Sequence, residues 1–68
     1  MNLPDIELVA SEVHNAWIEM KLSKGIKSSL SQSTGEEQMR PYFELSEEIK
    51  EYDRATVKAV YSAIEKLK

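Results

Sequence analysis

The chain has 68 residues, a net charge of −3 and no cysteine, which limits it to one small domain. The acidic balance disfavours a general nucleic-acid binder, which needs a concentrated basic surface, and the absence of cysteine excludes disulfides and thiolate zinc sites. In so short a chain, apolar burial gains little more than the ordering of the chain costs, so we expect oligomerisation or a bound ligand to add stability.

The first predicted helix runs from Pro4 to Lys24. Proline suits the first turn of a helix, and Gly25 is a typical residue just beyond a C-terminus. Apolar residues recur at spacings of three and four along this segment, which places them on one helix face. The predicted core stripe consists of Ile6, Val9, Ala10, Val13, Ala16, Trp17 and Met20.

Three other apolar residues of this helix, Leu8, Ile18 and Leu22, lie on its opposite side. Scattered surface apolar residues are ordinary, and that is one interpretation of these three. The other is a seam through which the chain associates with a second copy, and a core this small favours it. We therefore expect a homo-oligomer.

Residues 25–44 form a long connector without a sustained period. Unstructured loops of this length are uncommon unless they are functional or disordered, and several serines, Thr34 and Gly35 favour turns. Because a proline restricts the residue before it, we predict that Pro41–Leu45 run as a short strand or extended piece into the next helix. Apolar side chains can tether the connector to the helices: Ile26, Leu30, Met39, Tyr42 and Phe43.

The second predicted helix, Leu45 to Lys68, carries the longest helical signal of the chain. Ser46 is the predicted N-cap, and acidic residues in the first turn with lysines in the last suit the helix dipole. The predicted core stripe consists of Ile49, Tyr52, Thr56, Ala59, Val60, Ala63, Ile64 and Leu67. The opposite face, which we expect in solvent, carries Arg54, Lys58, Ser62 and Glu65.

The two apolar faces need one another, which predicts the fold class. We expect a mainly α fold, an antiparallel two-helix hairpin whose long, partly extended connector has room for short β pieces. Charges favour the same orientation, although exposed pairs are worth only about 0 to 1 kcal/mol each. The expected pairs are Lys21 and Lys24 with Glu44, Glu47 and Glu48, and Asp5 and Glu7 with Lys66 and Lys68.

No pattern of catalytic residues occurs in the sequence. A cysteine nucleophile, a nucleophile-elbow serine and a glycine-rich phosphate loop are all missing, so we expect no enzyme and no cofactor. His14, the single histidine, has no metal ligand or orienting carboxylate three or four residues away, which predicts that there is no metal site.

His14 and Asp53 are expected to hold the fold together. His14 lies at the edge of the first core stripe, where we expect its ring to be hydrogen-bonded to connector backbone, with a ligand contact as the alternative. Asp53 projects onto the apolar side of the second helix and must find donors there. We interpret it as a structural anchor that accepts hydrogen bonds from connector backbone or from His14, again with a ligand contact as the alternative.

Cations, hydroxyls and aromatic rings gather around the connector, as a phosphate-bearing nucleobase ligand would require. The alternative is that the lysines only cap the first helix and stay solvated. Residues of the candidate ligand site are His14, Trp17, Lys21, Lys24, Lys27, Ser28, Arg40 and Tyr42.

Two segments of the chain carry a resemblance to a known family. Residues 12–21 are EVHNAWIEMK, Gly25 follows, and residues 41–56 are PYFELSEEIKEYDRAT. This succession resembles the ryanodine receptor (RyR) repeat domain over nearly the whole chain. We expect residues 1–68 to form a single domain of this kind. The most specific matches are the His14 and Trp17 pair, Pro41-Tyr42, Leu45-Ser46 and the Tyr52-Asp53-Arg54 run.

The resemblance implies two antiparallel helices with a long connector and a function without catalysis. The family has small stand-alone bacterial and bacteriophage members, and this chain looks like one of those. Such relatives imply a binding module for a nucleotide-derived signal of antiviral defence, which a phage-encoded copy would sequester. The competing expectation is a protein-interaction or structural adaptor that docks through the face of Leu8, Ile18 and Leu22.

The N-terminal sequence predicts the location of the protein. Its first residues are acidic where a signal peptide would be basic, and no apolar run approaches the roughly 18 residues of a membrane span. We therefore expect a cytoplasmic protein, in the host cytoplasm if phage-encoded, with no membrane partner.

Overall fold

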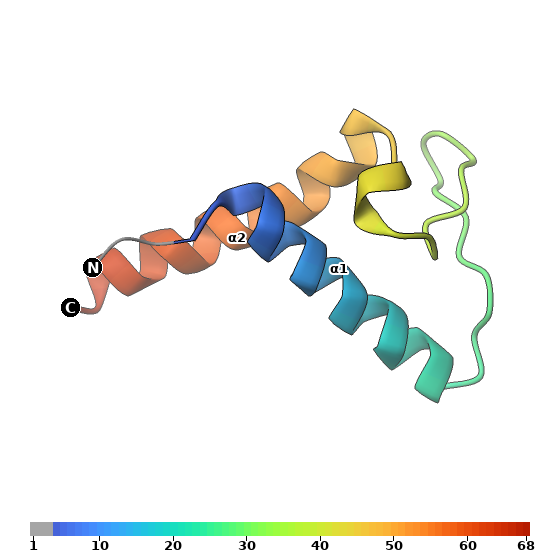
Figure 1. The fold of residues 1–68 in the computed structure, drawn as a ribbon, viewed down its shortest axis with the longest axis horizontal. Helices are drawn as coiled ribbons and strands as arrows, with labels where there is room; N and C mark the ends of the chain where they lie inside the picture. The colour runs from blue at the N-terminus through green and yellow to red at the C-terminus, as the bar shows by residue number, and fades with distance from the viewer. Residues whose placement is uncertain (1–3) are drawn as a thin grey trace.

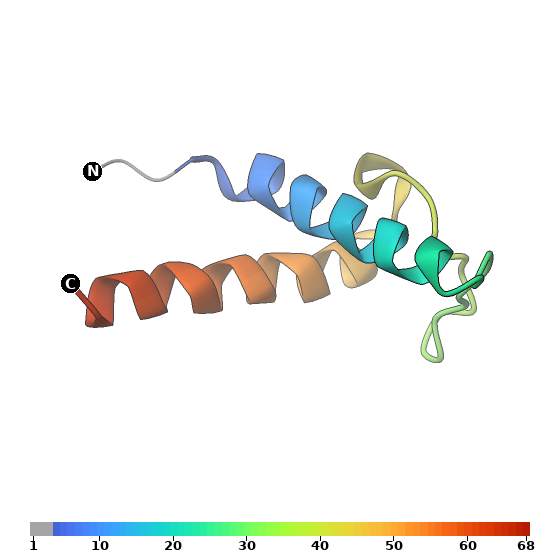
Figure 2. The same cartoon turned by 90° about the horizontal axis from the view of Figure 1, so that it is seen from below.

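The computed structural model describes residues 4–68, which fold into two long helices joined by an irregular connector (Figure 1). Helix α1 spans Ile6–Ser23 and helix α2 spans Glu47–Lys66, with a short 3-10 helix, η1, at Tyr42–Glu44. The two long helices run in opposite senses along the molecule (Figures 1 and 2). The predicted mainly helical hairpin is therefore confirmed.

Each long helix begins at a residue whose side chain caps it. The Asp5 carboxylate accepts a hydrogen bond from the Glu7 amide at 2.7 Å, and the Ser46 hydroxyl accepts one from the Ile49 amide at 3.4 Å. Helix α1 stops before Gly25, whose φ of +78° lies in the region that only glycine adopts freely. These local signals explain why the predicted helix boundaries are correct to within two residues.

The core is small and lies where the first half of α1 crosses the middle of α2 (Figure 1). Ala10 from α1, Tyr42 from η1 and Val57 from α2 form it, and each is at most 1% exposed. Tyr42 thus closes the core as a third element. Partly buried side chains surround this centre: Ile6, Val9, Val13 and Tyr61.

The predicted core stripe of α2 is wrong by part of a turn. Tyr52, Val60 and Leu67 are 58%, 52% and 85% exposed, whereas Val57 and Tyr61, which the prediction left out, pack on α1. Polar contacts orient the helix. The Tyr61 hydroxyl donates to the Pro4 carbonyl at 2.8 Å, and the inward face consists of Ile49, Asp53, Val57 and Tyr61.

The expectation that Arg54 lies in solvent is also wrong. Its guanidinium donates two hydrogen bonds of 2.7 Å to the Glu7 carboxylate of α1, and it forms ion pairs with Glu47 and Glu51 of its own helix. This fork ties the two helices together. Glu7 therefore pairs with Arg54 and not with the terminal lysines that the sequence suggested.

The last turns of α1 diverge from α2, which explains a second departure (Figure 1). Ala16 is exposed and Met20 is 40% exposed, although both belong to the predicted core stripe of α1. Trp17 is half-buried in the same stretch. The face of α1 beyond His14 is therefore more exposed than the predicted core stripe implied.

The connector is irregular but hydrogen-bonded. Leu30 and Glu37 form one isolated antiparallel β-bridge. The predicted extended piece at Pro41–Leu45 is wrong, because the amides of Glu44 and Leu45 donate to carbonyls three residues back, at 2.9 and 3.1 Å, and close the 3-10 turn η1. Within residues 4–68, no helix is long and apolar enough to cross a membrane.

Candidate ligand-binding pocket

A pocket of about 180 Å³ opens where α1, the connector and α2 meet. Trp17 and Tyr52 contribute aromatic rings, and the ring of Tyr52 is 58% exposed. Gln38 and Asp53 are polar residues of its lining. The full lining is His14 and Trp17 from α1, Gln38 from the connector, and Ile49, Tyr52 and Asp53 from α2.

His14 fixes this meeting point through both nitrogens of its ring. Nε2 lies 2.8 Å from the Gln38 carbonyl and 2.9 Å from the Arg40 carbonyl, while Nδ1 lies 3.2 Å from Asp53 Oδ2. The two carbonyls are acceptors, so Nε2 carries a hydrogen when it contacts them, and the contact between Nδ1 and Oδ2 needs one further hydrogen, on Nδ1 or on the Asp53 carboxyl. His14 is 3% exposed, and it stacks on Trp17 with 5.4 Å between ring centroids.

Both contacts expected of His14 and Asp53 are therefore present. The His14 ring holds connector backbone through Nε2, and Asp53 contacts its Nδ1. Burial raises the pKa of the Asp53 carboxyl above its ordinary value, and the neighbouring imidazole acts in the opposite direction. Asp53 keeps contact with the pocket, since its side chain is 16% exposed.

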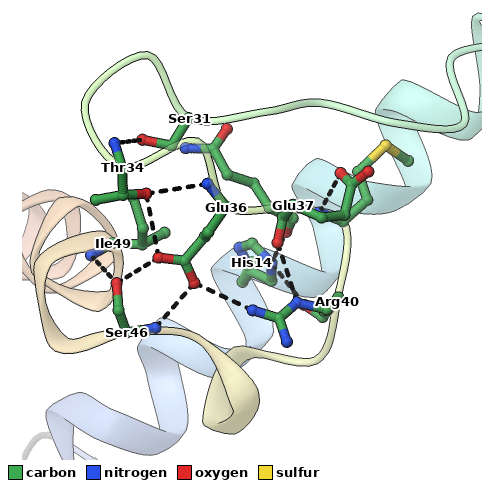
Figure 3. A network of polar contacts seen from close by, with 10 residues as sticks. His14, Ser31, Thr34, Glu36, Glu37, Arg40, Ser46 and Ile49 are labelled. Carbon is green, nitrogen blue, oxygen red and sulfur yellow. Dashed lines mark hydrogen bonds and ion pairs between the residues drawn. The ribbon is translucent and has the colours of Figure 1, made fainter.

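A network of two carboxylates shapes the connector around the pocket (Figure 3). Glu36 accepts from the Ser46 hydroxyl and from the Ser46 amide at 3.1 Å, which ties the connector to the start of α2. Glu37 accepts from the Ser28 hydroxyl and from the Ser29 amide at 2.7 Å. These hydrogen bonds hold the pKa of both carboxyls below the ordinary value.

The structure assembles only part of the candidate ligand site. Of the expected cations, Lys21 lies next to the pocket residue Trp17, with its Nζ 5.3 Å from the centroid of the Trp17 ring. Lys24 and Lys27 are exposed and do not line the pocket. Of the candidate ligand-site residues, His14 and Trp17 therefore line the same pocket, and Lys21 lies beside Trp17.

Three other candidates are engaged elsewhere in the fold. Arg40 donates to the Glu37 carbonyl at 3.1 Å and to the Glu36 carboxylate at 3.1 Å, and Ser28 donates to Glu37. Tyr42 is buried in the core, so it cannot face a ligand in the pocket. Arg40 and Ser28 therefore contact carboxylates of the connector itself, those of Glu36 and Glu37. Hydrophobic periodicity does not predict these contacts.

Sequence reasoning missed Gln38 and Tyr52 as pocket residues. Tyr52 was assigned to the core stripe, and the orientation of α2 turns it outward instead. Its position next to Asp53 was the available signal. The sequence around Gln38 contains no pattern that predicts its place. Two contacts fix that place: the Gln38 amide donates to the Ser29 carbonyl at 2.9 Å, and the His14 ring contacts the Gln38 carbonyl.

The proposed seam residues of α1 lie at the surface. Leu8 and Leu22 are 61% and 53% exposed, and Ile18 is half-buried. Both interpretations of these residues, scattered apolar side chains and a self-association seam, are compatible with these exposures.

The fold and the pocket define a small helical-hairpin domain with an ordered connector. The family model described as RyR domain matches residues 4–68, so the chain belongs to the RyR domain family and the resemblance stated above is confirmed. No curated protein and no solved structure matches the chain significantly. Five of the six pocket residues fall within the two segments that carry the resemblance: His14, Trp17, Ile49, Tyr52 and Asp53.

Proposed function

We propose that this domain is a non-enzymatic binding module whose pocket holds the base of a nucleotide-derived small molecule. The supporting observation is the pocket lining, which combines the rings of Trp17 and Tyr52 with the hydrogen-bonding groups of Gln38 and Asp53. Stacking of a base on an aromatic side chain contributes roughly 1–3 kcal/mol. Flat rings that also hydrogen-bond suit this lining.

The size of the pocket supports a ligand that enters it only in part. Drug-sized ligands occupy pockets of about 300–1,000 Å³, whereas this one measures about 180 Å³. One ring system fits, and the sugar and phosphate then lie outside. Lys21 follows Trp17 by four residues on the same side of α1, and its Nζ lies over the Trp17 ring, where it can reach a phosphate at the mouth.

The engagement of His14 favours binding over catalysis. Both ring nitrogens already contact protein groups, so the ring cannot take a proton from a bound substrate without giving up a contact to the connector or to Asp53. In a cell that uses nucleotide signals for antiviral defence, such a module would act by sequestering the signal.

Fluorescence of the single tryptophan tests the proposal directly. Titration with mononucleotides, cyclic dinucleotides and ADP-ribose derivatives should change Trp17 emission with at least one of them, and calorimetry on the same ligand should give the same Kd. Tyr52→Leu should weaken that binding. Phe43→Leu is the matched control, because Phe43 and Tyr52 are both 58% exposed and only Tyr52 lines the pocket. Equal loss in both variants would contradict the proposed pocket.

The alternative function, an interaction or structural adaptor, has support from Leu8 and Leu22. Large apolar side chains exposed by 61% and 53% on one helix are suited to contact with another chain. Light scattering at tens of micromolar tests the case in which that chain is a second copy. The molar mass of the wild type should then exceed that of a monomer, and the mass of Leu22→Glu should equal that of a monomer. A monomeric wild type would remove the seam.

A further inference from the structure

Part of the apolar stripe of α2 is left in solvent by the fold. All of its residues belong to the core stripe predicted from the sequence, and all of them are exposed. The last turns of α2 extend beyond the start of α1 (Figures 1 and 2). An amphipathic helix that exposes its apolar stripe is suited to contact with a second surface. The exposed residues, here called the α2 strip, are Tyr52, Thr56, Ala59, Val60, Ala63, Ile64 and Leu67.

A second helix can reach the α2 strip without displacing α1. Val57 packs in the core against α1 and is 1% exposed. Thr56 lies in the middle of the strip, and one step along a helix turns the side chain by about 100°. Ala59 and Ala63 add only methyl groups to the strip, so the backbone of a second helix can come close.

The order of residues along the strip points to a second copy of α2 as its occupant. Val60 lies near the centre, with Thr56 and Ile64 four residues to either side. Around a two-fold axis at Val60, an antiparallel copy places each Ile64 against the partner's Thr56. It also places each Leu67, which is 85% exposed, against the partner's Tyr52, which is 58% exposed. The strip is therefore complementary to itself.

Charge favours the same antiparallel pairing. The half of α2 from Glu47 to Val57 contains four carboxylates and two cations, which gives a formal charge of −2. Residues 58–68 contain three lysines and one glutamate, which gives +2. An antiparallel copy lays each acidic half along the basic half of its partner, whereas a parallel copy would lay like charge on like charge.

We propose that two copies of this domain associate through their α2 strips, antiparallel around a two-fold axis at Val60. Residues 52–67 of a helix span about 24 Å, and a contact one helix face wide falls short of the roughly 800 Å² per partner of a stable interface. The dimer is therefore weak, with a Kd on the order of 100 µM or above, and the protein is monomeric at low micromolar concentration. Because Tyr52 also lines the pocket, its ring becomes less exposed in the dimer.

Sedimentation equilibrium between about 20 µM and 1 mM measures this association. The apparent molar mass should rise from that of a monomer towards that of a dimer across the range. Val60→Glu places two like charges at the two-fold axis and should keep the protein monomeric. Leu22→Glu is the matched control, because Leu22 and Val60 are 53% and 52% exposed and only Val60 belongs to the α2 strip. This control should associate as the wild type does.

Two results of that experiment would overturn the proposal. One is a wild type that stays monomeric at about 1 mM. The other is a dimer that persists in Val60→Glu when far-UV circular dichroism shows the variant to be folded. Loss of the dimer in Leu22→Glu alone would assign the contact to α1 instead.

Cross-linking tests the geometry separately and does not depend on the folding of Val60→Glu. The chain contains no cysteine, so an introduced thiol is unique. Under mild oxidation with copper phenanthroline, Val60→Cys should give a disulfide-linked dimer, since the two-fold axis brings both thiols together. Leu67→Cys should not, because its two thiols lie about 20 Å apart in the antiparallel pair. Cross-linking of Leu67→Cys as efficient as that of Val60→Cys would overturn the antiparallel arrangement.

Discussion

His14 joins three segments of the chain through one ring. Its nitrogens reach the connector carbonyls of Gln38 and Arg40 and the carboxylate of Asp53 on α2, while its backbone belongs to α1. A buried acceptor that loses its donor costs about 1–3 kcal/mol. The single histidine is therefore a structural residue first, and it also forms one wall of the pocket.

Replacement of this ring should destabilise the domain strongly. His14→Leu keeps an apolar side chain in place but leaves the buried acceptors without donors, so we expect a loss of about 2–4 kcal/mol in the free energy of unfolding. Domains of this length are held by only about 3–10 kcal/mol. Urea unfolding followed by circular dichroism measures the change. Asn15→Leu, at an exposed neighbouring position, should change stability by less than about 0.5 kcal/mol, and an equal loss in the two variants would contradict the role of the ring.

The orientation of α2 about its own axis is an element-scale property that polar contacts decide. Asp53 and Tyr61 have partners on the N-terminal half of the chain, and both lie on the face that carries Val57. A count of apolar residues instead favours the face of Val60 and the alanines. Asp53 and the Tyr61 hydroxyl need hydrogen-bond partners when they are buried. The free-energy cost of leaving them unpaired outweighs the gain from burying the apolar stripe of Val60 instead.

Two valines on this helix test its orientation. Val57 is 1% exposed and Val60 is 52% exposed. Val57→Ala removes two buried methyl groups and should cost about 2 kcal/mol, whereas Val60→Ala should cost less than about 0.5 kcal/mol. The substitutions are chemically identical, so helix propensity cancels. Thermal unfolding of both variants gives the comparison, and a larger loss for Val60→Ala would restore the face predicted from the sequence.

Element boundaries were predictable from the sequence, whereas element faces and connector contacts were not. Ser46 caps the start of α2 and Gly25 follows the end of α1, and both effects depend only on neighbouring residues, which the sequence shows directly. The Asp53 contact with His14 was predictable because a carboxylate on an apolar face needs a donor. The positions of Gln38 and Tyr42 depend on contacts with residues far along the chain or on a 3-10 turn, and hydrophobic periodicity contains neither.

The connector depends on two ionised carboxylates, so acid should loosen it. The pKa of Glu36 is lowered chiefly by the Ser46 hydroxyl, and that of Glu37 chiefly by the Ser28 hydroxyl. A carboxyl with a lowered pKa in the folded state stabilises the fold above its ordinary value of 4.5, and this contribution is lost as the pH falls through the folded pKa. The raised pKa of Asp53 acts with the opposite sign, since its contribution is lost as the pH rises.

Amide resonances follow the acid effect site by site. The Ser46 amide donates to Glu36 and the Ser29 amide donates to Glu37, so both resonances should shift and both amides should lose protection against exchange as the pH falls below 4.5, while amides in the middle of α2 stay protected to lower pH. Glu37→Gln should abolish the acid step at Ser29 and leave the one at Ser46. Simultaneous loss of all amides would show instead that the connector does not open separately from the helices.

At the scale of the whole molecule, the pocket lies at the point where the fold is held together. Among residues 4–68, five apolar side chains are buried, with Ala10, Tyr42 and Val57 in one cluster, and hydrogen bonds fix the connector. The pocket takes residues from α1, the connector and α2. A ligand there contacts all three segments, so its binding free energy adds directly to a small free energy of unfolding.

Ligand binding should therefore stabilise the domain and the connector together. A ligand present at 100 times its Kd adds about 2.7 kcal/mol to the free energy of unfolding, which for a domain of this length raises Tm by about 10–20 °C.

Hydrogen exchange should slow at the Gln38 amide, which donates to the Ser29 carbonyl at the pocket. The Gly35 amide, which donates to the Ser31 carbonyl at 2.8 Å, belongs to the same connector but lies outside the pocket lining, and serves as the internal control. We expect the ligand to slow exchange more at Gln38 than at Gly35, because a base against Gln38 opposes local opening there. This difference should disappear in Tyr52→Leu. Equal slowing at both amides would mean that the ligand only shifts global unfolding.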